Sequence, residues 1–202
     1  MHVYANRRSP IPVAAPTVAT TDRQSLRFDL RQQTADAHAR LDASVGSLDT
    51  VSDYVRYCRA LFRFRAQLEA AIAKAIPNGI DGWQPLAIAD LLRSDLADLN
   101  ASPVTDMDQP PYQLDHGGLL GALYVLEGSS LGAQILVHRA TALGFSASHG
   151  ARHLALQTHD KKRWPGFVAI LDREGAANPH AVVEGAQEAF SRALQIFSED
   201  AP

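Results

Sequence analysis

The chain has 202 residues, of which 46% are apolar and 20% charged, and its net charge is −3. A chain of this length and composition is typical of one soluble globular domain with a core of its own, and its charge excludes a general attraction to nucleic acid. Cys58 is the only cysteine, which excludes an internal disulfide and a thiolate metal cluster and favours a reducing cytoplasm. No run approaches the roughly 18–20 apolar residues of a membrane span, so a membrane association is not expected.

Residues 1–22 are expected to form a disordered extension that precedes a single domain over residues 23–202. Arg7 and Arg8 come before an apolar segment, 11–19, and this order faintly resembles an export signal. Prolines at positions 10, 12 and 16 interrupt the segment, and no clear hydrophobic region follows them. We therefore expect a cytoplasmic protein.

From residue 23 onward the apolar residues recur at helical spacing. A first helix is predicted over about 23–44, and a second is predicted to begin with Ser52 as its N-cap and to stop at the turn 77–79. A third is predicted over about 85–99, followed by a polar loop at 100–111. The stripe of the first helix consists of Leu26, Leu30, Thr34, His38, Leu41 and Val45.

The second half of the chain is also helical by pattern. A glycine-rich helix is predicted over about 116–143, ending at Gly144, and two shorter helices near 148–157 and 163–173. Asn178-Pro179 supplies an N-cap and an N1 proline for the last helix. No window shows the alternation of a strand. The predicted fold is therefore an all-α, single-domain helical bundle.

Five glycines interrupt the apolar run from Gly117 to Val137, GGLLGALYVLEGSSLGAQILV. Each costs a helix roughly 1 kcal/mol relative to alanine, so their number needs a reason. Gly121, Gly128 and Gly132 are seven and four residues apart and share one helical face. A face without Cβ atoms admits either a neighbouring helix or a planar ligand. For the Gly128–Gly132 pair, close helix packing is the default interpretation in a soluble protein.

His38 lies in the apolar stripe of the first helix, where a buried imidazole must form a hydrogen bond or bind a metal. Asp42, one turn later, is placed to accept a hydrogen bond from one ring nitrogen. The spacing fits a metal ligand, but a hydrogen-bonded core histidine is the default interpretation. His149 and His153 are four residues apart, but no acidic residue completes a metal site, and we expect them on the solvated surface.

These two unusual features complement each other. One helix offers a single imidazole, and another offers a backbone surface free of side chains. A porphyrin between them would have an axial nitrogen ligand on one face and close backbone on the other.

Three segments of the sequence resemble motifs of one known family. The first, residues 30–42, LRQQTADAHARLD, is similar to the proximal-helix motif of the haem oxygenase family, in particular its bacterial, biliverdin-producing branch. Residues 124–133, YVLEGSSLGA, resemble the distal-helix motif of the bacterial members. Residues 185–197 are similar to the closing helix, and together the resemblance spans about 25–198. It implies a haem-oxygenase-like helical fold.

The resemblance also implies roles for individual residues. His38 matches the iron ligand of the proximal helix, and Asp42 matches the carboxylate that hydrogen-bonds that ligand. Gly128 and Gly132 match the glycines at which the distal helix kinks over the haem. Ser129 stands where animal members carry an aspartate that organises water around bound oxygen.

Further residues match the walls and rim of the haem pocket. The resemblance assigns Arg31 and Lys161 to the haem propionates, although Pro165 stands where a second basic partner is expected. Tyr124 falls one position from the tyrosine of the animal enzymes. Two aromatic residues, Phe190 and Phe197, resemble pocket walls. Because propionate anchoring sets how the ring is rotated, these departures bear on which meso carbon is attacked.

The implied activity is the cleavage of haem, as both substrate and cofactor, with O2 and electrons from an external ferredoxin or reductase, to biliverdin, carbon monoxide and ferrous iron. His38 would hold the iron, Gly128 and Gly132 would steer oxygen toward a meso carbon, and water near Ser129 would supply the proton. A phytochrome is an expected recipient of the biliverdin. The alternatives are a haem or tetrapyrrole binding or sensing protein without turnover, and a helical interaction module whose glycines serve packing alone.

Overall fold

The computed structural model of the protein describes residues 25–75, 80, 82–104 and 110–199. The residues of the expected extension, 1–22, and the turn at 77–79 lie outside these ranges. Within them the chain is helical, with isolated β-bridges and no named strand. The helices in chain order are α1 (Leu26–Gln33), α2 (Ala35–Val45), α3 (Val51–Ala75), α4 (Ala89–Asp98), α5 (His116–Ala142), α6 (Arg152–His159), α7 (Arg163–Glu174), the short 3-10 helix η1 (Gly175–Ala177) and α8 (Pro179–Glu199). The predicted all-α architecture is confirmed.

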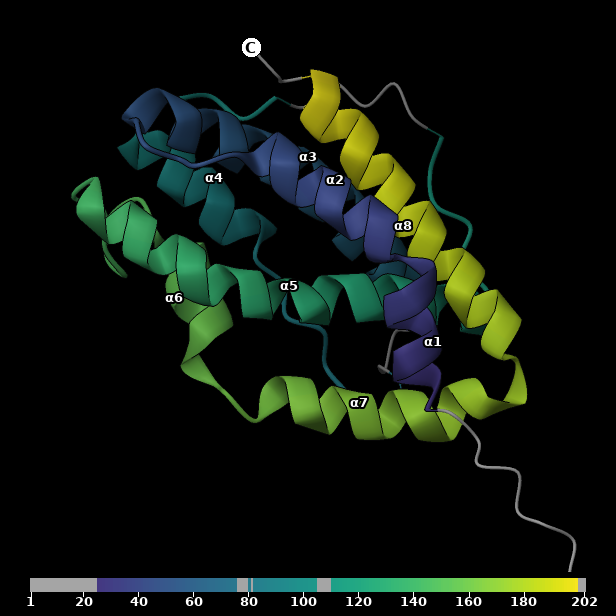
Figure 1. The fold of residues 1–202 in the computed structure, drawn as a ribbon. Helices are drawn as coiled ribbons and strands as arrows, with labels where there is room; N and C mark the ends of the chain where they lie inside the picture. The colour runs from purple at the N-terminus through teal and green to yellow at the C-terminus, as the bar shows by residue number, and fades with distance from the viewer. Residues whose placement is uncertain (1–24, 76–79, 81, 105–109, 200–202) are drawn as a thin grey trace, which may run out of the picture.

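The glycine-rich helix α5 runs through the middle of the bundle (Figure 1). Its first half crosses α8, which is its most extensive partner, while α6 and α7 pack against it from the side below α5 in Figure 1. The helices α3 and α4 pack on each other, and α2 packs on α8. These helices share one hydrophobic core. The first half of α5 is deeply buried in it.

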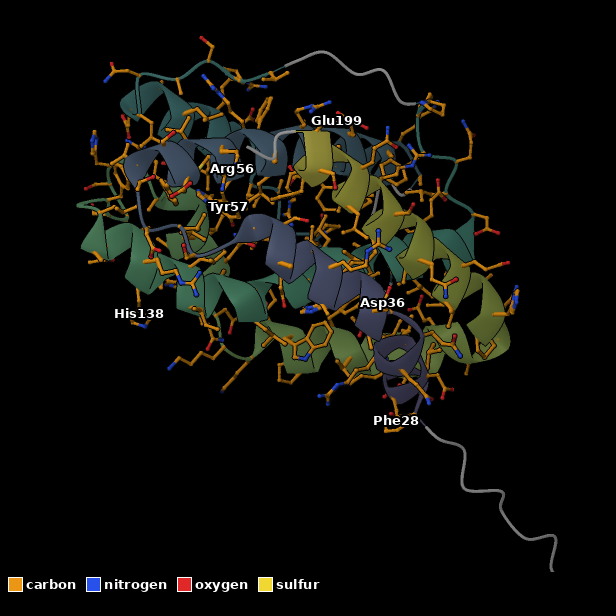
Figure 2. All side chains as sticks on the ribbon, turned by 45° about the horizontal axis from the view of Figure 1, so that its top comes forward. Phe28, Asp36, Arg56, Tyr57, His138 and Glu199 are labelled. Atoms are coloured by element: carbon orange, nitrogen blue, oxygen red, sulfur yellow. The ribbon has the colours of Figure 1, made fainter. Side chains whose placement is uncertain are left out.

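The predicted first helix is in fact two helices that meet at Thr34. The backbone of Thr34 leaves the helical region, with φ −109° and ψ 3°, and its hydroxyl donates to the carbonyl of Leu30 at 2.8 Å. On α1 the apolar stripe is buried, at Leu26 and Leu30. The structure describes the whole of α2, and none of its residues is buried. Phe28 and Asp36, on either side of the break, project outward (Figure 2).

Several predicted boundaries are shifted by local hydrogen bonding. The second helix begins at Val51 rather than after Ser52, because Thr50 and Asp53 cap each other: the Thr50 amide donates to the Asp53 carboxylate at 3.2 Å, and the Asp53 amide to the Thr50 hydroxyl at 3.1 Å. The helices predicted over 85–99 and 148–157 begin later, as α4 and α6, because residues 85–88 and 148–151 form irregular connections. Asn178 caps α8 as predicted and accepts from the amide of Ala181 at 3.2 Å.

One helix is more apolar than the sequence reading allowed. By length and composition α5 alone among the described helices qualifies as a membrane span, with a mean hydropathy of 1.4 in its most apolar window. The same helix supplies core residues from Gly117 to Glu127, and core helices of soluble proteins pass this test too. Its apolar character follows from its central place in the bundle.

A candidate planar-ligand site on the glycine-rich helix

The glycines of the first half of α5 are explained by contact with α8. A Cβ at Gly117 would collide with the side chain of Ala181, and one at Gly121 with the backbone of Val182 and Ala186. In return, a Cβ at Gly185 would lie 2.5 Å from the Cα of Gly118. The two backbones therefore touch at the crossing, and only glycine fits there.

The next two glycines on that face have no such partner. A Cβ at Gly128 would meet only the ring of Trp164, at an ordinary 3.5 Å, and a Cβ at Gly132 would meet no described atom within 4 Å. Leu131 and Ile135, which flank this surface, leave 49% and 60% of their area exposed. Protein packing therefore does not account for the glycine at position 132, and the surface around it is both apolar and uncovered.

The exposed leucine and isoleucine were missed in the sequence reading. Ile135 is seven residues after Gly128, so helical periodicity places it on the same face. The sequence therefore carries the signal, but in a helix apolar on all sides it does not show which face is exposed.

Two consecutive serines follow Gly128 and bond to the helix itself. The Ser129 hydroxyl donates to the carbonyl of Leu126 at 2.7 Å, and the Ser130 hydroxyl to that of Glu127 at 2.7 Å. Such bonds compete with the helical ladder and favour bending. The Ser129 oxygen also lies 3.0 Å from Oε1 of Gln157 on α6, a buried side chain that sequence reasoning missed.

A buried carboxylate next to Gly128 holds α7 against α5. Glu127 is 2% exposed and accepts two hydrogen bonds from Arg163, at 2.7 and 2.6 Å, and one from the indole of Trp83 at 3.0 Å. This pairing fixes the start of α7, where Trp164 lies over Gly128 and 5.7 Å from the ring of Tyr124. The sequence signal for this cluster is Glu127 itself, a lone acidic residue in an apolar run.

A buried guanidinium supports the same turn of α5 from the other side. Arg65 of α3 is 1% exposed; it donates to Glu69 at 2.7 Å, to the carbonyl of Leu86, and more weakly to the carbonyl of Leu126 at 3.4 Å. Burial lowers the pKa of Arg65, and Glu69 and Glu127 oppose that shift, so the cation is retained. Ionic contacts thus hold the residues just before Gly128 on two sides.

His38 is not in the core, contrary to the prediction. It lies on α2 with 63% of its side chain exposed, because the break at Thr34 carries α2 onto the outside of α8. The expected neighbour is present, since Nδ1 of His38 lies 3.2 Å from Oδ2 of Asp42. An Nδ1–H that donates to this carboxylate leaves Nε2 with a free lone pair, which is the state of a metal-binding imidazole.

The two phenylalanines predicted as pocket walls separate in the structure. Phe190 of α8 meets the ring of His38 edge-on, with 5.9 Å between ring centroids. Phe197 is buried and packs against Tyr57 in the core, 6.3 Å between centroids. Only Phe190 adjoins the histidine.

The predicted propionate partners lie near the surface. Arg31, in the last turn of α1, is exposed, and its charge acts on Tyr124. Partial burial raises the pKa of Tyr124, while the hydroxyl of Thr34 and the charges of Arg27 and Arg31 oppose the shift. Lys161 is exposed in the turn between α6 and α7. Arg31 and Tyr124 therefore lie close together; no contact of either with Lys161 is observed among the described residues.

A groove of about 310 Å³ runs between α2 and α8, lined by Ala37 and Arg40 on one side and Gln187, Ser191 and Leu194 on the other. None of the predicted site residues lines it, and its wall is largely polar in residue type. The apolar surface on which a glycine meets no described side chain is the one at Gly132, one turn after Gly128.

His153 is buried, and the prediction of a solvated histidine was wrong. Its side chain is fully buried on α6, and Nδ1 lies 2.8 Å from Oδ2 of Asp95 on α4. A single sequence gives no sign of this pairing, because the two residues are 58 positions apart. No group of three His, Cys, Asp or Glu side chains that could hold a metal ion occurs in the described parts of the chain.

Comparisons with known proteins identify the family of this chain. Residues 24–199 match the family model described as Heme oxygenase. Heme oxygenase PigA of Pseudomonas aeruginosa is 35% identical over 187 residues, covering 84% of this chain and 92% of the relative. A heme oxygenase of Xanthomonas campestris is 30% identical over 138 residues, covering 67% of this chain and 81% of the relative.

Among solved structures, the NO- and CO-bound heme oxygenase from Neisseria meningitidis superposes with a TM-score of 0.70 at 28% identity. The match covers 87% of this chain and 92% of that one. Both the sequence and the arrangement of helices therefore lead to the same assignment. The chain belongs to the haem oxygenase family, whose members degrade haem.

Proposed function

We propose that this enzyme holds haem between α2 and the open surface of α5, with His38 as the iron ligand on one face and the backbone at Gly128 and Gly132 on the other. The observation that carries the proposal is Gly132, whose missing side chain serves no contact within the described protein. A flat ligand gives both that glycine and the exposed Leu131 and Ile135 a physical purpose.

The partly buried apolar residues of α2 support the same placement. Its apolar residues Ala37, Leu41 and Val45 are only half-buried against the core. A porphyrin ring against this helix would remove further apolar area from water, at roughly 25 cal/mol for each Å². Asp42 would keep the proton on Nδ1 of His38, so that Nε2 faces the iron.

The polar rim of the site suits the haem propionates. We assign Arg31 and Lys161 to them, and Tyr124 and Phe190 to the walls of the site. A guanidinium and an ammonium are the side chains that best neutralise carboxylates at a protein surface. The rotation of the ring, and with it the biliverdin isomer, would follow from these two contacts.

Within the site the chain supplies position and hydrogen bonds, while haem supplies the redox chemistry. The close backbone at Gly128 and Gly132 would confine O2 to one side, toward a meso carbon, and a water held at Ser129 would bring the proton. The products would be biliverdin, carbon monoxide and ferrous iron. Side chains do not supply the electrons that this reaction consumes. These electrons would come from an external ferredoxin or reductase.

The single cysteine, Cys58, is a buried thiol, which suits the cytoplasm that we propose as the location. A phytochrome that takes up the released biliverdin would be a fitting recipient.

Replacement of His38 by alanine tests the iron ligand. His180 offers a matched control, because it is an exposed histidine that pairs with a carboxylate four residues later, Glu184, at the same 3.2 Å. We expect His38→Ala to change the Soret band of the haem-titrated protein and to reduce biliverdin formation by more than about 100-fold. His180→Ala should behave as wild type. The readouts are absorption spectra and chromatography of the product after reduction under O2.

Two outcomes would contradict the proposal in different ways. An unchanged Soret band in His38→Ala means that another residue binds the iron. Haem binding by the wild type without biliverdin, with ascorbate or a reductase present, means that the chain binds haem without degrading it.

A further inference from the structure

The hydroxyl of Ser129 has two protein acceptors and one proton. It lies 2.7 Å from the carbonyl oxygen of Leu126 and 3.0 Å from Oε1 of Gln157. A hydroxyl that donates to either of these keeps both lone pairs free. Toward the open glycine surface, Ser129 can therefore only accept a hydrogen bond as long as its proton stays on the protein.

Gln157 is held in place more firmly than a surface glutamine. Its side chain is 5% exposed, and it lies one helical turn after the fully buried His153 on α6. The start of α6 is fixed to α4 because Asp95 accepts from the amides of Arg152 and His153, each at 3.1 Å, and faces Nδ1 of His153 at 2.8 Å. The glutamine therefore meets Ser129 from a helix that has little freedom to move.

We propose that Gln157 is a positioning residue for haem degradation: together with the carbonyl of Leu126 it keeps the hydroxyl proton of Ser129 on the protein side, and so makes this serine a fixed acceptor for the water on the O2 side of the haem. That water donates one O–H to Ser129, which directs its other O–H toward the reacting centre. The proton itself comes from solvent through the water, and Gln157 is chemically unchanged. The inference rests on the haem placement proposed above.

The substitution Gln157→Leu removes the acceptor at nearly constant volume, and Gln157→Glu restores an acceptor. Thr158→Val is the matched control, since Thr158 is half-buried on the same helix and its hydroxyl donates within α6, to the carbonyls of Leu154 and Ala155. The readouts are the midpoint pH of the acid–alkaline transition in the spectrum of the ferric haem complex, and the rate of biliverdin formation.

In Gln157→Leu the Ser129 hydroxyl loses one of its two protein acceptors and keeps the carbonyl of Leu126, so its proton is held less firmly and turns more often to donate into the site. We expect the midpoint to fall by about 0.5–1 pH unit and the rate to fall about three- to tenfold, the size of one hydrogen bond. Gln157→Glu should recover the rate to within about twofold of wild type. The double variant with Ser129→Ala should be no slower than Ser129→Ala alone, because both changes remove one interaction.

If Gln157→Leu has the same midpoint pH and the same rate of biliverdin formation as Thr158→Val, this inference is overturned and the proposed function is left intact. A wild-type protein that binds haem and forms no biliverdin overturns both. A Gln157→Leu change that adds fully to Ser129→Ala shows that the two side chains act separately, which also contradicts the positioning role.

Discussion

At the scale of single residues, the buried pair of His153 and Asp95 is the most demanding feature of the protein. The imidazole packs beside the rings of Tyr54 and Tyr57, with centroids 6.4 and 6.1 Å away, and its Nε2 has no partner among the described residues. Burial lowers the pKa of His153 despite the opposing carboxylate. Burial raises the pKa of Asp95, but hydrogen bonds from His153 and Arg152 outweigh this and lower it overall. A neutral imidazole therefore donates from Nδ1 to a carboxylate anion.

This pair predicts a loss of stability in mild acid. Below pH 6.5 the unfolded chain binds a proton at His153 that the folded protein resists, so the free energy of unfolding falls by up to about 1.4 kcal/mol for each pH unit. Asp95, whose folded pKa is depressed, adds a second loss as the pH falls below about 4. Urea unfolding of the wild type at pH 7, 6 and 5 measures the first of these.

The variant His153→Phe keeps an aromatic ring but cannot titrate. We expect it to cost about 2–4 kcal/mol at pH 7, because Asp95 loses a buried donor, and to flatten the dependence between pH 6.5 and 5. His159→Gln, an exposed change on the same helix, is the control and should unfold as wild type does. A pH dependence that persists in His153→Phe would assign the effect to other groups.

At the scale of elements, α5 uses the same helical face for two purposes. Near its start the glycines admit the backbone of α8, and beyond the crossing they leave an open surface. The difference can be measured with two alanines. Gly121→Ala places a methyl group in the backbone of α8 and should lower the free energy of unfolding by about 1–3 kcal/mol.

Gly132→Ala should not lower the free energy of unfolding, in contrast to Gly121→Ala. With space around the new methyl group and a better helix former, the haem-free protein should be as stable as wild type or up to about 1 kcal/mol more stable. Biliverdin formation should nevertheless fall by at least about tenfold, because the methyl group occupies the surface that faces the haem. Thermal unfolding and turnover assays separate the two effects. Full turnover in Gly132→Ala would mean that haem lies elsewhere.

At the scale of the whole molecule, the helical domain is expected to be complete without residues 1–22. The family model matches from residue 24, and the first described helix begins at Leu26, which is buried. We expect removal of residues 1–22 to change the free energy of unfolding by less than about 0.5 kcal/mol and to leave haem degradation unaltered. Removal of residues 1–30 is the control.

That longer deletion also takes away Leu26 and Leu30, which are 7% and 0% exposed. Since each buried leucine contributes about 2–5 kcal/mol, the domain should be severely destabilised. Chemical unfolding and product chromatography on both truncated proteins provide the comparison. Loss of activity in the shorter deletion would place part of the functional domain before residue 23.

Much of the fold could be predicted because the signals for its helices are local in the sequence. The spacing of leucines, the Asn178-Pro179 cap and the absence of alternating patterns indicate an all-α bundle, and each of these signals depends on neighbours within a turn or two. The two motifs around His38 and Gly128 likewise indicate a haem oxygenase, which the comparisons confirm. The cost of five glycines in one helix is also a property of the chain alone.

Only the tertiary structure decided what covers each face. Periodicity shows that a helix has an apolar side, but it does not say which neighbour buries that side. The break at Thr34 left His38 exposed while its stripe appeared continuous, and the contact with Asp95 buried His153 in spite of a polar sequence around it. The same reason separates the glycines: Gly121 meets α8, whereas Gly132 meets no described side chain, and this difference exists only once the helices are packed.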